Sequence, residues 1–341
     1  MTRRMRIAQI GCGGRAQAHL AAMMTHPDVE VVALCDRDEA RLHATGERFG
    51  ITARYTDLAQ AIAQSAPDLV DIVTPPEIRL SIIEAAIAAG APAILIEKPL
   101  ALTPSESRAI TKLGAERLIA VNTQYQWMPH WQEIWQILRT QQLGAIRSIR
   151  ASTGVNILEQ GPHVLDLTFT AIEAAGLPAP EWVLASCEGL EWFGQTPVPA
   201  DTSAVMGIGD IRLFFNAGPS APPVPGETNK YYQQQLEIIG ERGRIWVSLN
   251  QGWQWWSEGA FRSGRTAWPD DDDVAQRALF GQLHQTLIGG ADWRVFPTHI
   301  THAYRRQQAM FACYASSQLR QRVALTQEWG DELMHTLRTA H

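Results

Sequence analysis

The sequence predicts an α/β protein of two domains. The first, residues 1–121, is expected to form a doubly wound parallel sheet, and the second, residues 122–341, an α/β domain with a largely antiparallel open sheet. Up to residue 121, strand-like and helix-like segments alternate, as they do when crossover helices join parallel strands. Beyond it, several strand-like segments alternate apolar with polar residues, which is typical of an antiparallel sheet with unlike faces. A chain of 341 residues also exceeds one typical domain.

The first strand, residues 6–10, runs directly into a glycine turn of the form G-x-G-x-x-A. Gly11 supplies the tight turn, and Gly13 supplies bare backbone, which lets a pyrophosphate reach the N-terminus of the following helix. Ala16 occupies the third position, where a small side chain allows close packing of helix on strand. The turn predicts a Rossmann dinucleotide-binding domain.

A second apolar segment, residues 29–35, ends at Asp36, about 20 residues beyond Ala16. A carboxylate at this position can accept hydrogen bonds from ribose hydroxyls, and the alternative is that Asp36 caps the helix that begins near Asp38. Arg37 could pair with a 2′-phosphate. NAD is therefore favoured, and NADP stays possible.

The rest of the first domain continues the alternation. Helical segments are predicted at 39–49, 57–64, 78–89 and 104–116, and strands at 68–74, 93–96 and 118–121. The strand at 68–74 ends at Pro75 and Pro76, and the strand at 93–96 ends at Glu97-Lys98-Pro99. Both ends lie at the edge where open α/β sheets bind ligands.

The second domain has a different rhythm. Trp127, Trp131 and Trp135 recur every four residues on a helix that should reach residue 142, and we interpret them as a core or interface stripe rather than a sugar platform. The crowded Trp253, Trp255 and Trp256 leave burial and exposure equally open. Strands are predicted at 146–153, 182–190, 203–208, 211–215, 231–239 and 244–249, helices at 161–175, 280–288 and 301–321, a loop at 218–226 and a solvated helix start at 270–273.

Composition excludes several classes of protein. A formal charge of −6 argues against nucleic-acid or membrane partners, and no run of 18 apolar residues occurs. The four cysteines lie far apart, and His299 and His302 have no further ligand beside them, so no metal site is expected. Arg3-Arg4 leads straight into the first strand, and we expect a cytoplasmic protein.

In the second domain, Glu159-Gln160-Gly161-Pro162-His163 opens a helix. Together with the G-x-G-x-x-A turn, Glu97-Lys98-Pro99, Pro75-Pro76, residues 144–147 and residues 315–317, this segment resembles the Gfo/Idh/MocA family of oxidoreductases over nearly the whole chain. The resemblance implies that Lys98 reaches the reacting hydroxyl and that His163 takes its proton. Independently, alcohol oxidation needs a base that titrates near neutral pH beside a cation, and histidine with lysine supplies both.

Three residues depart from the family pattern. Glu159 stands where the family usually has aspartate, so it orients His163, contacts substrate, or does neither. Arg79 replaces a frequent histidine, which leaves a solvated helix position and a role near the cofactor equally open. Pro162 stiffens the backbone before His163.

The candidate residues form three groups. Lys98, His163 and Glu159 are the catalytic candidates. Asp166 either binds a substrate hydroxyl or pairs within its helix. With it, the substrate-binding candidates are Lys98, His163, Tyr125, Gln126, Trp127 and Asn156, and the cofactor-binding candidates are Gly11, Gly13, Gly14, Arg15, Ala16, Asp36, Arg37, Thr74, Pro75, Pro76, Glu97 and Lys98.

The leading functional hypothesis is an NAD(P)-dependent dehydrogenase or reductase acting on a ring hydroxyl or carbonyl of a sugar, inositol or related polyol. The resemblance also allows an enzyme that cleaves or eliminates a glycoside through transient oxidation by tightly bound NAD. A noncatalytic NAD-binding sensor is a third hypothesis, against which the presence of both Lys98 and His163 speaks. The family commonly assembles through its second domain, and a homodimer or homotetramer is expected.

Overall fold

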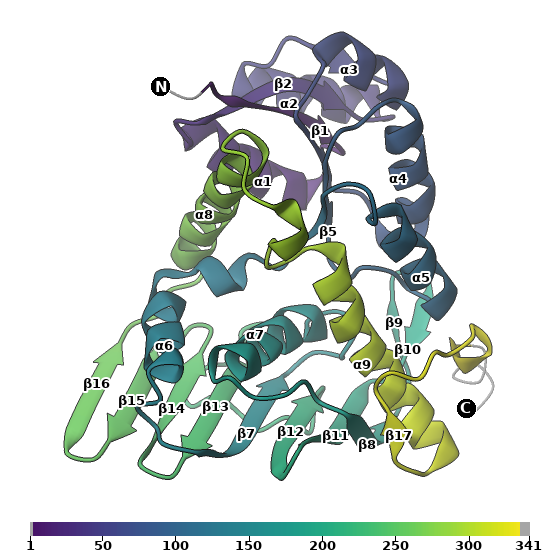
Figure 1. Cartoon of the computed structure of the whole chain (residues 1–341). Helices are drawn as coiled ribbons and strands as arrows, with labels where there is room; N and C mark the ends of the chain where they lie inside the picture. Colours follow the sequence, from purple (N-terminus) through teal and green to yellow (C-terminus); the bar gives the residue numbers. More distant parts are fainter. Residues whose placement is uncertain (1–2, 335–341) are drawn as a thin grey trace. The chain divides into compact units, whose positions relative to one another are not determined.

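The computed structural model describes residues 3–334. The chain forms two compact units: unit 1 comprises residues 1–102, 106–127 and 273–304, and unit 2 comprises 103–105, 128–272 and 305–341. The sequence analysis predicts a single division after residue 121, whereas in the structure unit 1 continues to residue 127 and also includes residues 273–304. Figure 1 labels the helices and strands of both units.

Unit 1 is built on a six-stranded sheet in which every pairing is parallel. The strand order is β3-β2-β1-β4-β5-β6, the doubly wound arrangement. This confirms the predicted Rossmann sheet. The strands are β1 (Met5–Ile10), β2 (Val29–Cys35), β3 (Arg54–Tyr55), β4 (Leu69–Ile72), β5 (Ile94–Glu97) and β6 (Ile119–Asn122).

Helices cover both faces of this sheet. Buried residues of α3, α4 and α5 pack on one face, and those of α1 and α2 on the other. Burial of both faces explains why the central strands β4 and β5 are buried at every position and apolar except at Asp71 and Glu97, rather than alternating apolar with polar residues. The helices are α1 (Gly14–Thr25), α2 (Glu39–Phe49), α3 (Leu58–Ser65), α4 (Arg79–Ala88) and α5 (Pro104–Leu113), with short 3-10 turns η1 (Pro76–Ile78), η2 (Gln124–Trp127) and η3 (Trp293–Val295).

A helix from late in the sequence completes unit 1. Helix α8 (Asp270–Leu287) is continuous, so the two predicted segments at 270–273 and 280–288 are one helix. Leu279, Phe280 and Leu283 are fully buried in the same core cluster as Leu20 of α1. The face of the sheet that carries α1 is therefore closed by a segment more than 200 residues away in sequence.

Unit 2 is built on a nine-stranded sheet with the order β16-β15-β14-β13-β7-β12-β11-β8-β17. All pairings are antiparallel except that of β7 with β12. This confirms the largely antiparallel sheet. The strands are β7 (Ile146–Thr153), β8 (Trp182–Glu188), β11 (Asp201–Ile208), β12 (Ile211–Ala217), β13 (Gln234–Gly240), β14 (Gly243–Ser248), β15 (Trp253–Ser257), β16 (Ala260–Gly264) and β17 (Val323–Ala324), with a separate hairpin of β9 (Glu191–Phe193) and β10 (Thr196–Val198).

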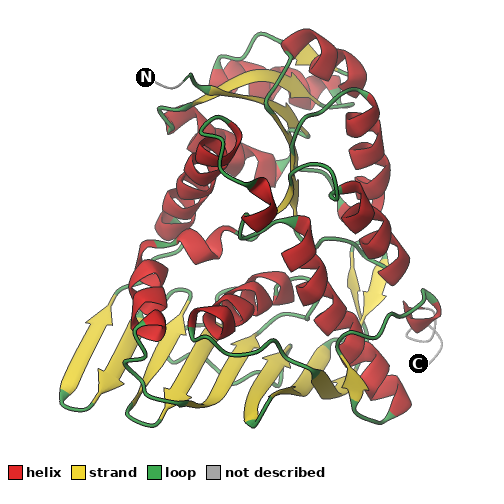
Figure 2. Ribbon diagram, in the orientation of Figure 1, coloured by secondary structure: helices red, strands yellow, loops and turns green. Residues whose placement is uncertain are grey.

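One face of this sheet carries helices α6 (Pro129–Arg139), α7 (Gly161–Ala174) and α9 (Ile300–Leu319), as Figure 2 shows. Alternate strand residues such as Ile149, Leu213 and Ile238 are buried beneath them. Their neighbours Arg150, Phe214 and others point to the opposite face, which no described helix of unit 2 covers.

The tryptophans divide between the units. Trp131 and Trp135 are buried in α6 and stack with ring centroids 4.8 Å apart, as expected of a core stripe. Trp127 lies in η2 outside that helix and packs near Phe296 of unit 1, with centroids 6.0 Å apart. Trp253 and Trp255 are buried in β15, which resolves for these two residues the alternatives that the sequence left open.

Candidate functional site

The glycine turn of unit 1 has the geometry of a dinucleotide cradle. Gly11 has φ +92°, and a Cβ there would lie 2.3 Å from the carbonyl oxygen of Val73, so only glycine fits. A Cβ on Gly13 or Gly14 would meet nothing within 4 Å, which leaves open space at the N-terminus of α1. No side chain caps that helix at Gly13. Exposed amides at a helix N-terminus suit a pyrophosphate, so these residues fit the cofactor that the sequence predicts.

Asp36 is fixed at the end of β2. One carboxylate oxygen accepts a hydrogen bond from the Cys12 amide at 2.8 Å and the other from the Asp38 amide at 2.9 Å. The side chain that caps α2 is Asp38, which accepts from the Arg41 amide, so the capping alternative for Asp36 is wrong. Arg37 is exposed beside it, and the Arg41 guanidinium lies 3.6 Å from Asp36. The carboxylate is thereby held at the edge of the turn, where a ribose would bind.

The loop after β4 places Thr74, Pro75 and Pro76 at the same edge of the sheet. Arg79 follows it at the start of α4 and is 1% exposed, so the solvated alternative for Arg79 is wrong. Its guanidinium donates to the carbonyl oxygens of Pro99 and, at 3.2 Å, Thr74. Burial lowers the pKa of Arg79 to about 10, and the side chain still carries its charge at neutral pH. Arg79 thus ties together the loops that end β4 and β5.

Glu97 and Lys98 follow from the end of β5. Glu97 is buried, and its Oε1 lies 3.0 Å from Nε of Arg15 in the first turn of α1. Its Oε2 accepts the backbone amide of Lys98 at 3.0 Å. Burial works to raise the pKa of Glu97, but the charge of Arg15 and a hydrogen bond from His19 hold it well below its usual range. Lys98 is half-buried.

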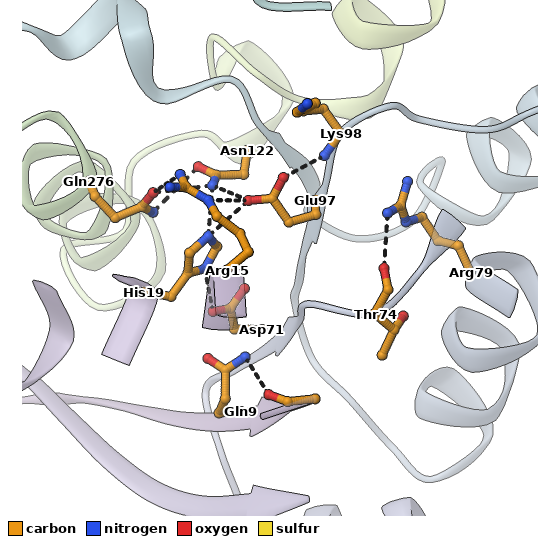
Figure 3. Close-up of polar contacts among 11 residues, drawn as sticks. Gln9, Arg15, His19, Asp71, Thr74, Arg79, Glu97, Lys98, Asn122 and Gln276 are labelled. Atoms are coloured by element: carbon orange, nitrogen blue, oxygen red, sulfur yellow. Dashed lines mark hydrogen bonds and ion pairs between the residues drawn. The ribbon is translucent and has the colours of Figure 1, made fainter. Parts of the chain in front are cut away.

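Sequence reasoning missed several residues that gather around Glu97. His19, Asn122 and Gln276 all lie within hydrogen-bond distance of one another or of Glu97 (Figure 3). Their positions 19, 97, 122 and 276 show no local pattern, because the contacts form only when β5, β6, α1 and α8 pack together. The one local signal was His19 itself, a polar residue on the face of α1 that carries the buried Ala16 and Leu20.

In unit 2 the loop between β7 and α7 holds a second cluster. Asn156 is 1% exposed, and its Oδ1 accepts from the amides of Leu158 at 3.1 Å and Glu159 at 2.9 Å. Its Nδ2 donates to Glu159 at 3.4 Å and to Glu191 on the β9–β10 hairpin. Glu191 was missed because the hairpin itself was not predicted. The Asn156 carboxamide thus contacts two carboxylates, Glu159 from the loop before His163 and Glu191 from the hairpin.

Helix α7 carries His163 and Asp166 in its first turns, and both are buried. Oδ1 of Asp166 lies 2.7 Å from Nε of Arg306 on α9. This ion pair joins two helices, so Asp166 has a partner outside its own helix. The carboxylate is 3% exposed and the guanidinium 5%, and such a buried pair fixes α7 against α9.

Three further candidates lie in or next to η2 of unit 1. Tyr125 and Gln126 are buried, and Trp127 is half-buried against Phe296. Unit 1 thus contains the glycine turn, Lys98 and these three residues. Unit 2 contains Asn156, Glu159, His163 and Asp166.

Among residues 3–334, no group of three or more His, Cys, Asp or Glu side chains could hold a metal ion. Over the same residues, no helix has the length and hydrophobicity needed to span a membrane.

A family model described as an oxidoreductase family with an NAD-binding Rossmann fold matches residues 5–124. The oxidoreductase ORF334 of Rhizobium meliloti is 32% identical over 241 residues, which cover 66% of this chain and 69% of that protein. A D-apiose dehydrogenase of Paraburkholderia graminis is 37% identical over 145 residues, 42% of this chain and 38% of that enzyme. A second one, from Rhizobium rhizogenes, matches over 50% of its length. The chain thus spans half or less of the D-apiose dehydrogenases that it matches.

Solved structures share the fold over nearly the whole chain. An oxidoreductase from Agrobacterium radiobacter, in complex with NAD+, L-tartaric acid and magnesium, has a TM-score of 0.80 at 19% identity, covering 94% of this chain and 98% of that one. The apo scyllo-inositol dehydrogenase from Lactobacillus casei has a TM-score of 0.74 at 17% identity, covering 96% and 100%.

Proposed function

Because this chain belongs to the Gfo/Idh/MocA family of NAD-binding oxidoreductases, we propose that it transfers a hydride between nicotinamide and a ring hydroxyl or carbonyl of a sugar, inositol or related polyol. The observation that carries the proposal is the position of Lys98. It follows Glu97 at the carboxyl end of β5, the edge where a doubly wound sheet binds its ligand.

Within unit 1, Gly13, Gly14 and Asp36 would hold the pyrophosphate and a ribose of the cofactor. When bound, NAD supplies the acceptor for the hydride. Lys98 would place its ammonium on the reacting oxygen and stabilise alkoxide character there. His163 would accept the hydroxyl proton, and in the reverse direction it would return that proton to the carbonyl oxygen.

The relatives support a carbohydrate or polyol as substrate. Two of them are D-apiose dehydrogenases, and a structural neighbour is a scyllo-inositol dehydrogenase. All three names denote substrates with several neighbouring hydroxyls. In unit 2, Asn156, Glu159 and Glu191 present a carboxamide and two carboxylates, which can accept hydrogen bonds from such hydroxyls.

The experiment is a turnover assay of the variant Lys98→Met with a panel of sugars, inositols and glycosides. Loss of the ammonium should lower kcat by about 10²-fold to 10⁴-fold, while NADH still binds because the glycine turn is intact. The matched control is Lys112→Met, on α5, which should keep full activity. Full turnover of Lys98→Met would refute the assignment.

The same assay separates net oxidation from redox-assisted cleavage. Nicotinamide absorbance and substrate loss are followed together in one sample. NADH that accumulates in step with substrate loss supports the dehydrogenase. Substrate loss without NADH would instead identify an enzyme that recycles its cofactor.

We also propose that a second copy of the chain covers the open face of the unit 2 sheet. This face holds a cavity of about 470 Å³ lined by Phe214, Trp246, Arg150 and Glu237 among others. Phe214 is 40% exposed, and Arg150 lies 3.6 Å from Glu237, so apolar and oppositely charged groups alternate as in self-complementary interfaces. Light scattering should show a dimer or tetramer that Phe214→Glu dissociates and Val295→Glu, an exposed change in unit 1, does not. A monomeric wild-type chain would refute this.

A further inference from the structure

His19 lies fully buried on α1 between two carboxylates. Its Nδ1 lies 2.8 Å from Oδ2 of Asp71, and its Nε2 lies 2.9 Å from Oε1 of Glu97 (Figure 3). An ionised carboxylate only accepts hydrogen bonds, so a ring with a proton on each nitrogen satisfies both contacts. Nε2 also lies 2.8 Å from Nδ2 of Asn122, which donates to Glu97 and Gln276. The partners thus specify an imidazolium. Burial works to lower the pKa of His19, but the charges and hydrogen bonds of Asp71 and Glu97 raise it to about 9.

The charges in this cluster balance. Asp71 and Glu97 supply two negative charges, and His19 and Arg15 supply two positive ones. Arg15 is the less buried of the two cations, with a side chain 32% exposed, whereas the His19 ring is completely enclosed. Among residues 3–334, the cation that lies against Asp71 is His19, so His19 is the group that neutralises it.

Glu97 is the centre of the cluster. Its Oε1 also accepts from Arg15 at 3.0 Å and from Nδ2 of Asn122 at 2.8 Å. Oε1 of Gln276 on α8 accepts from Asn122 at 3.1 Å and from Arg15 at 3.2 Å, which closes a ring of hydrogen bonds. The other carboxylate oxygen accepts the amide of Lys98. One side chain therefore links the first turn of α1, where Arg15 adjoins the glycine cradle, to the backbone of the lysine.

We propose that His19 is a positioning residue whose buried imidazolium clamps Glu97, so that the glycine turn and the Lys98 backbone are held as one rigid piece. The inference rests on the proposed function for the role of Lys98 in turnover. Its structural part, the charged clamp and its effect on the turn, does not depend on that role.

A competing explanation is that His19 only fills space. Its ring meets Phe280 edge-on with centroids 6.2 Å apart, as an apolar side chain also could. The two explanations differ in what they demand of the ring. Packing alone does not require the proton on each nitrogen or the specific contact with Glu97.

The first measurement uses the wild-type chain with ¹⁵N-labelled histidine, and no cofactor. We expect one histidine with both ring nitrogens protonated from pH 6 to pH 8, absent from the spectrum of His19→Gln. A neutral ring at pH 7 would overturn the proposal.

The second measurement compares His19→Gln with His19→Asn. The glutamine amide reaches the position of Nε2 and can still donate to Glu97, whereas the asparagine amide reaches only the position of Nδ1 and donates to Asp71. We expect NADH, titrated by its fluorescence, to bind about 10-fold more weakly to His19→Asn and within about 3-fold of wild type to His19→Gln. Equal affinity for NADH in both variants and the wild type would overturn the clamp.

The variant Asp71→Asn, which keeps an acceptor for Nδ1 and removes one buried charge, provides a third chain should His19→Asn fail to fold. In Asp71→Asn, the His19 ring should lose a proton at lower pH than in the wild type. An unchanged titration of His19 would contradict the charge balance.

Turnover of D-apiose and scyllo-inositol is measured on the same variants beside Lys98→Met. A clamp on Lys98 should lower kcat of His19→Asn at least 10-fold with KM within about 3-fold, and His19→Gln should recover part of that loss. Full activity in Lys98→Met would refute the proposed function, and the ring titration and the NADH affinities would then still decide on the clamp. Inactive Lys98→Met beside fully active His19→Asn would refute the clamp alone.

Discussion

Substituting two glycines of the same turn should affect two different properties of unit 1, its stability in one variant and its affinity for NAD in the other. Gly11→Ala adds a methyl group at φ +92°, directly against the carbonyl oxygen of Val73 at 2.3 Å. Gly13→Ala adds the same group at φ −70°, where any residue is allowed and where nothing lies within 4 Å. The two changes are chemically identical and differ only in what the methyl group meets.

The cost of Gly11→Ala has two parts. A left-handed backbone costs a residue with a Cβ about 1–2 kcal/mol, and forcing a methyl group into packed backbone costs about 1–3 kcal/mol more. The sum of about 2–5 kcal/mol is a large share of the ~5–15 kcal/mol that stabilises a typical domain. Gly13→Ala should cost less than about 0.5 kcal/mol, but its methyl group fills the space where the pyrophosphate would approach the amides of α1.

Hydrogen exchange followed by mass spectrometry measures the two units separately. In Gly11→Ala, peptides from β1 should exchange at least about 30-fold faster, as ~2 kcal/mol implies, while peptides from β13 in unit 2 should not change. Gly13→Ala should exchange like the wild type and bind NADH at least about 10-fold more weakly. Normal NADH affinity in Gly13→Ala would show that the pyrophosphate lies elsewhere, and unchanged β1 protection in Gly11→Ala would refute the steric argument.

Four further outcomes are expected. Phe280→Ala should destabilise unit 1 by about 3–5 kcal/mol, seen as faster exchange in β1, whereas exposed Val274→Ala should not. Asp36→Asn should weaken NADH binding about 10-fold, measured by fluorescence titration; equal affinity would remove Asp36 from the ribose site. Glu191→Gln should raise KM for the polyol several-fold with kcat within about 2-fold, and a fall in kcat alone would contradict a binding role. Because the pKa of His19 is raised to about 9, its contribution to the free energy of unfolding should be complete below pH ~6.5 and be lost as the pH rises through 9. The loss should be up to about 1.4 kcal/mol per pH unit. Urea denaturation should show this pH dependence in the wild type and not in His19→Gln.

The parts of the molecule that the sequence predicts correctly are those with local causes. The turn at Gly11 follows from the glycine spacing beside an apolar strand, and the ends of helices such as α2 follow from residues like Asp38 and Gly50. Sheet type follows from continuous versus alternating apolar residues, since each reflects burial of two faces or one.

The parts that it does not predict depend on contacts between distant segments. Asp71 reads as an ordinary residue of a buried strand until α1 brings His19 against it. For Arg79, the sequence leaves a solvated helix position and a role near the cofactor equally open, and its guanidinium finds its acceptors only in the folded loops after β4 and β5. Glu191 requires a short hairpin with weak periodicity to fold next to Asn156. A polar residue within an apolar segment indicates a buried polar contact, but the sequence does not show which distant residue makes that contact.

The return of the chain to unit 1 with residues 273–304 has a consequence for biosynthesis. The matched family region ends at residue 124, yet Leu279, Phe280 and Leu283 are needed to cover the sheet it contains. At about 5–20 residues per second, roughly 9–35 s pass between synthesis of residue 127 and residue 304. During that interval α1 and α2 cover this face of the sheet, but the apolar part that α8 covers is still open. Chaperone binding to nascent chains should therefore peak in this window and fall once α8 has left the ribosome.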